Sequence, residues 1–98
     1  MVGKASITNL LPPERARRLR SGLGLELRRR RLEAHLSQAS VSAPMTRAYI
    51  SQVEAGRTLP SIPALIFLAE RLGTSADEIL RSVNRTLSVE YPDRHEDR

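Results

Sequence analysis

The most constraining stretch of the sequence lies between residues 37 and 56, where helix caps and helix breakers alternate at close spacing. Ser37 can cap a helix through its hydroxyl, but Pro44 ends that helix early because it has no N–H to donate. Thr46 can cap the next helix, and Gly56 can end it because glycine readily adopts a left-handed conformation. The pattern therefore predicts two short helices joined by a tight turn.

The second of these helices has an apolar side and a side of short or polar residues. Ile50 and Val53 are spaced so that both face inward, while Arg47 lies elsewhere on the helical wheel. A slim helix with polar residues in its first turns can enter the major groove of DNA. The stretch therefore predicts a DNA-binding helix-turn-helix at about residues 37–54.

Apolar residues recur at helical spacing in three further segments, at about residues 23–36, 61–72 and 75–83. Ser61 and Ser75 stand where they can cap the last two of these helices. Only 3% of the residues are aromatic, so the core must be built from aliphatic side chains, which favours packed helices. We expect an all-α fold of five helices in one domain, which 98 residues can form.

The two ends of the chain are expected to lie outside this domain, which we place at residues 21–84. Residues 1–20 are predicted to be an N-terminal arm or a short basic helix, because Gly22 weakens continuity with the helix that follows. Residues 85–98 are predicted to be a short C-terminal extension that ends in a flexible tail. Apolar residues alternate over 87–91, which indicates either a dimerisation strand or an extended segment.

The charge of the chain agrees with a nucleic-acid partner. The formal net charge is +5, from 16 cationic and 11 acidic residues, and all of the cationic residues except Lys4 are arginines. Arginine pairs with phosphate and with guanine edges in a planar, bidentate manner. The run Arg28 to Arg31 is longer than one helical turn, so its side chains cannot share one face. We interpret Arg29 and Arg30 as part of a solvated face.

Several other functions lack the residues that they need. The chain has no cysteine, which excludes disulfides, thiolate metal sites and cysteine nucleophiles. His35 and His95 have no supporting carboxylates at metal-ligand spacing, so we expect no metal site and no other cofactor. No catalytic set or phosphate-binding glycine loop is present, and we expect no enzyme activity. No apolar run approaches the roughly 20 residues of a membrane span, and we expect a cytoplasmic protein without membrane contact.

One specific pattern runs through the middle of the chain: Ser37-Gln38, Tyr49-Ile50-Ser51, Val53-Glu54, Gly56 and Pro60-Ser61. With the apolar residues on either side of it, this pattern makes residues 23–80 resemble the phage-repressor-like (Cro/repressor, XRE-type) helix-turn-helix DNA-binding family. The resemblance implies a five-helix, lambda-repressor-like DNA-binding domain.

The resemblance also implies which side chains meet DNA. Base edges would be read by Arg47, Ala48 and Gln52, because arginine suits guanine, glutamine suits adenine and a small apolar group suits the thymine methyl. A second set would contact phosphates, which fixes the register of the protein without reading sequence: Gln38, Thr46, Tyr49, Ser51 and Arg57. Tyr49 has the alternative of packing in the core.

Inside the domain, the resemblance implies a structural ion pair between Arg31 and Glu54. Two features depart from the family pattern. The segment that holds Ala43-Pro44 is about two residues shorter than usual, which should shorten the first helix of the pair. Arg30 stands where the family has an apolar residue, and we expect Leu32 to take that place in the core.

We therefore expect a sequence-specific transcriptional regulator, a dimeric repressor of an inverted-repeat operator. One such domain makes too few base contacts to be specific in a genome, and two-fold pairing doubles them. The alternative is an antitoxin or other interaction module that autoregulates its own promoter. The expected partners are double-stranded DNA, a second copy of the chain and, in the alternative, a toxin or antirepressor. Apolar positions of the fifth helix are the first candidate for the dimer surface, and residues 87–91 are the second.

Overall fold

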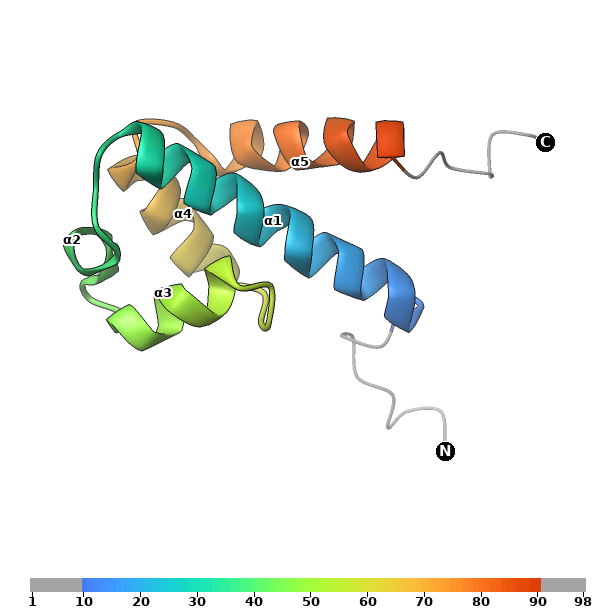
Figure 1. Cartoon of the computed structure of the whole chain (residues 1–98), viewed down its shortest axis with the longest axis horizontal. Coiled ribbons are helices and arrows are strands. Elements are labelled where there is room, and N and C mark those ends of the chain that lie inside the picture. The colour runs from blue at the N-terminus through green and yellow to red at the C-terminus, as the bar shows by residue number, and fades with distance from the viewer. Residues whose placement is uncertain (1–9, 91–98) are drawn as a thin grey trace.

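Five helices follow one another in the described part of the chain, residues 10–90 of a computed structural model. They are α1 (Pro13–Glu33), α2 (Gln38–Ser42), α3 (Arg47–Glu54), α4 (Ile62–Arg71) and α5 (Ala76–Glu90). The two longest helices, α1 and α5, pack against each other, and the three shorter helices lie below them (Figure 1). Within residues 10–90 the fold is all-α, as the sequence predicts, and none of these helices has the length and apolar character to cross a membrane.

The helix α1 joins two segments that the sequence predicted to be separate. It begins at Pro13 and runs for 21 residues without a break at either of its glycines. A Cβ at Gly24 would lie only 2.7 Å from the carbonyl oxygen of Glu54, and closer still to that of Val53. A Cβ at Gly22 would merely touch α5 side chains at 3.5 Å. Gly24 therefore lets α1 approach the end of α3 closely, and this packing offsets the helix-weakening effect of glycine.

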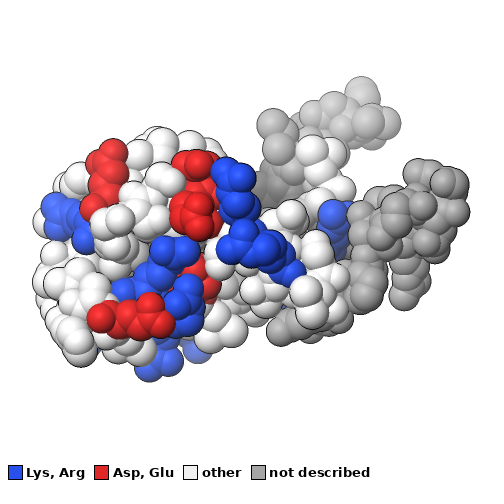
Figure 2. Space-filling view, turned by 90° about the horizontal axis from the view of Figure 1, so that it is seen from above, with Lys and Arg blue, Asp and Glu red and all other residues white. Residues whose placement is uncertain are grey.

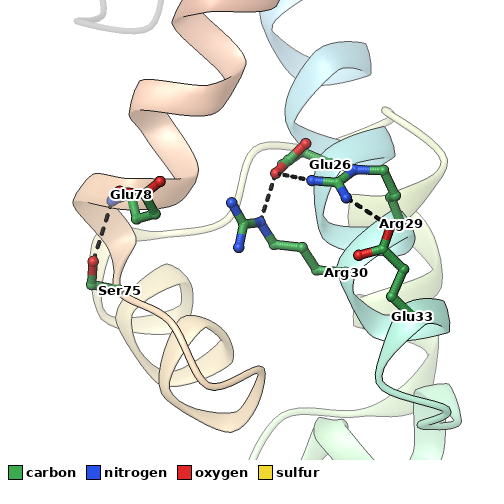
Figure 3. Close-up of polar contacts among 6 residues, drawn as sticks. All are labelled: Glu26, Arg29, Arg30, Glu33, Ser75 and Glu78. Carbon is green, nitrogen blue, oxygen red and sulfur yellow. Dashed lines mark hydrogen bonds and ion pairs between the residues drawn. The ribbon is translucent and has the colours of Figure 1, made fainter.

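Side-chain caps define where the later helices begin. The residue before each of them accepts a hydrogen bond from the backbone N–H three positions on: Ser37 from Ser40 at 3.1 Å, Thr46 from Tyr49 at 3.0 Å, Ser61 from Ala64 at 3.2 Å and Ser75 from Glu78 at 3.3 Å. Figure 3 shows the last of these caps. These bonds satisfy N–H groups that a helix leaves unpaired in its first turn. The capping residues predicted from sequence are therefore confirmed.

Three of the helices end in the same way, with a residue of positive φ just beyond the last turn. This residue is Gly56 after α3 (φ 77°), Gly73 after α4 (φ 76°) and His35 after α1 (φ 60°). In each case the N–H of this residue and the N–H of the residue after it donate to carbonyl oxygens of the last helical turn. Glycine adopts this conformation at no steric cost, whereas the Cβ of His35 opposes it. The end of α1 is thus the strained member of the three.

The core is aliphatic, as the composition requires, and every helix contributes to it. Its buried members are Leu23, Leu27, Val41, Ile50, Val53, Leu65, Leu68, Ala69, Ile79 and Val83. Val41 is the buried residue of α2, so even this five-residue helix is anchored to the rest of the domain. Burial of one aliphatic side chain of this size is worth about 1.5–3 kcal/mol.

Leu32 does not take the core position that the sequence analysis assigned to it. Its side chain is 50% exposed, because the buried residues of α1 form the stripe Leu23, Gly24, Leu27 and Arg31, and position 32 falls outside that stripe. Arg30 is partly buried and forms an ion pair with Glu26. The departure from the family pattern at position 30 is therefore accommodated by a charge pair and not by a neighbouring leucine.

The helix α5 extends to Glu90, over residues that the alternating pattern predicted as a strand or an extended segment. Leu87 packs against the core one turn after the buried Val83. Position 87 therefore fits the helical spacing of the core residues as well as the alternating pattern. Val89 is 80% exposed. The predictions made for residues 1–9 and 91–98 lie outside the described residues.

Candidate nucleic-acid interface

The helix α3 divides into a buried side and an exposed side. Ile50, Val53 and Glu54 are buried, whereas the side chains on the opposite surface are exposed along the whole helix: Arg47, Ala48, Ser51 and Gln52. The three residues predicted to read bases therefore share one exposed surface. None of them fills the core, so their chemistry is available to a partner of α3.

Tyr49 combines the two roles that the sequence left open. Its ring is half-buried and packs against the core, while its hydroxyl oxygen accepts a hydrogen bond from the Ser61 N–H at 3.3 Å. This bond ties α3 to the first residues of α4. A phenol that accepts one hydrogen bond still has its own proton to donate, for example to a phosphate.

Exposed polar residues stand at both ends of α3. Thr46 precedes the helix, and its hydroxyl oxygen is used for the cap. Arg57 follows Gly56, and its backbone N–H bonds to the Gln52 carbonyl while its side chain is exposed. The predicted phosphate contacts Thr46, Ser51 and Arg57 therefore flank or border the exposed side of α3.

A buried polar cluster joins α1, α2 and α3. Arg31 holds the Glu54 carboxylate with two groups, Nε to Oε2 at 2.7 Å and Nη2 to Oε1 at 3.0 Å, and the two side chains are only 9% and 6% exposed. The third nitrogen, Nη1, donates to the Leu36 carbonyl oxygen at 2.7 Å. The hydrogen bonds with Glu54 raise the pKa of Arg31, although burial opposes this shift. The pair implied by the family resemblance is thus present, and it is bidentate.

Gln38 belongs to the same cluster, a feature that sequence reasoning missed. Its Nε2 donates to Oε1 of Glu54 at 3.0 Å, so the carboxylate binds side chains from both α1 and α2. The sequence predicted only a phosphate contact for this residue. Nothing in the spacing of positions 38 and 54 indicates the bond, because it depends on how the two helices are placed in space.

A second contact that was not predicted from the sequence holds the middle of α2. Nη1 of Arg71, in α4, donates to the Ser40 carbonyl oxygen at 3.2 Å. The same guanidinium lies over the ring of Phe67, with its Cζ 4.6 Å from the ring centroid. The spacing of positions 67 and 71 is compatible with this stacking, but the link to α2 required the fold.

Acidic residues are nearly absent around α2 and α3. Between positions 34 and 69 the sequence contains one acidic residue, Glu54, and Arg31 neutralises it inside the domain. Among the described residues, no carboxylate pairs with the exposed Arg47 or Arg57. The segment from α2 to the start of α4 therefore carries exposed positive charge and contributes no exposed carboxylate of its own to repel a polyanion.

The face formed by α1 and α5 is different, because acidic and basic side chains lie next to one another there (Figure 2). Arg29 bonds to Glu26 at 2.7 Å and to Glu33 at 2.9 Å, and Arg30 bonds to Glu26 at 2.6 Å (Figure 3). Burial alone would raise the pKa of Glu26, but the hydrogen bonds from the two arginines bring it below its usual value. Of the arginine run, Arg29 and Arg30 are thus committed to ion pairs.

Comparison with known proteins agrees with this arrangement. A family profile described as a helix-turn-helix domain matches residues 22–81. The crystal structure of the clp gene regulator ClgR from Corynebacterium glutamicum superposes with a TM-score of 0.60, over 76% of this chain and 96% of that chain, at 23% sequence identity. Comparison with curated proteins gave no significant match.

The pair α2 and α3, with the helices that pack behind it, therefore forms a helix-turn-helix domain. The chain belongs to the helix-turn-helix domain family that this profile describes.

Proposed function

We propose that the protein is a sequence-specific DNA-binding regulator of transcription that acts as a dimeric repressor at an inverted-repeat operator. The observation that supports this function most directly is the exposed surface of α3. It presents Arg47, Ala48 and Gln52 together, and the helix itself has no exposed carboxylate. Helix-turn-helix proteins place the second helix of the pair in the major groove, with its N-terminal residues against base edges.

In this proposal Arg47 pairs with the O6 and N7 atoms of guanine, Gln52 pairs with adenine, and Ala48 contacts a thymine methyl. The phosphates on either side of the groove are bound by polar residues of α2, of α3 and of the positions that flank α3, namely Gln38, Thr46, Tyr49, Ser51 and Arg57. The base contacts give sequence preference, and the phosphate contacts give most of the affinity and its dependence on salt.

The proposal of a dimer follows from the small number of base-reading residues on one α3 helix. Two copies related by a two-fold axis would place their α3 helices about 34 Å apart, one turn of DNA, and would recognise an inverted repeat. The exposed apolar residues of α5, Leu80 at 41% and Val89 at 80%, support that helix as the contact between copies. Occupation of an operator that overlaps a promoter would repress by excluding polymerase.

The test is selection of DNA duplexes by the purified protein from a randomised library, followed by titration of the selected duplex in a salt series. We expect an inverted repeat to be enriched, and we expect its affinity to fall steeply with salt as counterions are displaced. Equal affinity for selected and random duplexes would contradict sequence-specific binding. Sedimentation of the complex gives the number of chains per duplex, and one chain on a site with a single half-site would contradict the dimer.

A further inference from the structure

Arg31 supports the start of α2 directly on one side and through Glu54 on the other. Its Nη1 donates to the carbonyl oxygen of Leu36, two residues before the helix, at 2.7 Å. Its other two nitrogens hold Glu54, and Glu54 in turn accepts the hydrogen bond from Nε2 of Gln38, the first residue of α2, at 3.0 Å. The start of α2 is therefore fixed by side chains from α1 and α3.

Besides these bonds, α2 receives a hydrogen bond from Arg71 of α4 at the Ser40 carbonyl oxygen, at 3.2 Å. It has five residues and one buried side chain, that of Val41. A helix this short makes little use of backbone hydrogen bonding, and its placement depends on tertiary contacts. The direct contacts from other helices are therefore expected to decide where Gln38 lies relative to α3.

We propose that the buried pair Arg31–Glu54 positions Gln38 for a DNA phosphate. This inference rests on the proposed function and names two residues that act on the phosphate contact without touching DNA. A primary amide has two N–H donors that diverge from one nitrogen. In Gln38 one donor bonds to Glu54, and within residues 10–90 the other donor has no protein partner. The side chain is only half-buried, so this second donor can meet a phosphate.

The advantage of this arrangement is that the side chain is ordered before DNA arrives. A free glutamine side chain samples many rotamers and loses that freedom when it binds a phosphate. Gln38 has already lost it through its bond to Glu54, so binding costs less. Arg31 has a second role here, because it neutralises a carboxylate that would otherwise repel the phosphate.

The experiment is a methylphosphonate scan of the selected duplex, in which each phosphate in turn is replaced by a neutral group. We expect one position to be sensitive through Gln38, with an affinity loss of about tenfold for the wild-type protein, as for a hydrogen bond to a charged group. Gln38→Ala should abolish this sensitivity, and Glu54→Leu, which has a similar volume but no acceptor for Nε2 of Gln38, should abolish most of it. Arg57→Ala is the control, and it should leave the sensitivity at that position unchanged.

Full sensitivity of Glu54→Leu at the phosphate that Gln38→Ala identifies would overturn the inference and leave the proposed function intact. Failure of the wild-type protein to prefer any duplex would instead count against the proposed function. A second measurement covers a Glu54 variant that does not fold. In the free wild-type protein, NMR should show one Gln38 side-chain amide proton protected from exchange, and an amide that exchanges like a free glutamine would overturn the inference.

Discussion

Two faces of the molecule use arginine in opposite ways. On α1, Arg29 and Arg30 stand three or four residues from a glutamate, and they form ion pairs along the helix. Around α3, the exposed Arg47 and Arg57 form no ion pair within residues 10–90, and the one carboxylate between positions 34 and 69 is buried. The spacing of glutamates, and not the number of arginines, therefore decides which face remains positive.

The comparison shows why net charge alone is a weak guide to a binding surface. Exposed ion pairs contribute little to stability, but they remove cations from the set that can meet a polyanion. A net charge of +5 does not show where the charge is available. The arrangement of acidic residues in the fold identifies the α3 face.

The largest effect is expected from placing a carboxylate on the α3 face. Ala48→Glu should lower affinity for the selected duplex by about 100-fold or more, because like charges in contact cost several kcal/mol. Its stability should be unchanged, since the position is exposed. The control is Leu25→Glu, at an exposed position of α1. Equal losses in both variants, measured by fluorescence anisotropy, would remove the distinction between the two faces.

Substitution of the two glycines of α1 tests how closely this helix must pack against α3 and α5. Gly24→Ala should lower the free energy of unfolding by about 1–3 kcal/mol, because its Cβ would meet backbone atoms of α3 that cannot move independently. Gly22→Ala, whose Cβ would make ordinary contacts with α5, should be neutral or stabilising by up to about 1 kcal/mol. Chemical denaturation measures both. If both variants are stabilising, α1 does not need its close approach to α3.

Removal of single arginines tests the comparison directly. Arg47→Ala should weaken binding to the selected duplex by about 1–3 kcal/mol and relax preference at one base position. Arg29→Ala should leave DNA affinity unchanged, because that guanidinium is held by Glu26 and Glu33. Competition between selected and random duplexes is the measurement. If Arg47→Ala weakens both duplexes equally, its role is a phosphate contact and not base reading.

A smaller effect is expected at the left-handed ends of α1 and α4. His35→Gly should stabilise the protein by about 1 kcal/mol, because the substitution removes a Cβ from a residue with φ of 60°. Gly73→Ala is the matched control, and it should destabilise by a similar amount, since its Cβ would meet no other atom and only its φ of 76° opposes it. Thermal unfolding of both variants measures these changes in stability. A lower stability of His35→Gly would contradict the proposal that His35 is strained.

The smallest effect concerns the ion pairs of α1. The pKa of Glu26 is lower in the folded protein than in the unfolded chain. The stabilisation that this gives is therefore present above the carboxyl's usual pKa and is lost as the pH falls through the folded value. Glu26→Gln should flatten this part of the pH dependence of unfolding, and an unchanged profile between about pH 6 and pH 3 would show that the pair contributes nothing.

Features set by neighbouring residues were predictable from the sequence. The caps at Ser37, Thr46 and Ser61 and the left-handed Gly56 were predicted because each depends on residues within one turn. The left-handed conformation of His35 was not predicted, since histidine carries no local preference strong enough to indicate it.

Features set by distant residues were not predictable. Gly22 and Gly24 weaken an isolated helix, and only the positions of α3 and α5 explain why α1 continues through them. Likewise, alternation over residues 87–91 resembles a strand until the packing of Leu87 against the core is known. The exposed side of α3 follows from helical spacing, but the bond from Gln38 to Glu54 needs the fold.

The division of α3 into two sides has a consequence for how such a protein can diverge. Arg47, Ala48, Ser51 and Gln52 contribute no buried side chain to the core, and the cap is provided by Thr46. Substitutions on this exposed side are therefore expected to be nearly neutral for folding, within about 0.5 kcal/mol. Under the proposed function, duplicated copies of the gene could acquire new operators by changing these positions, without loss of the scaffold.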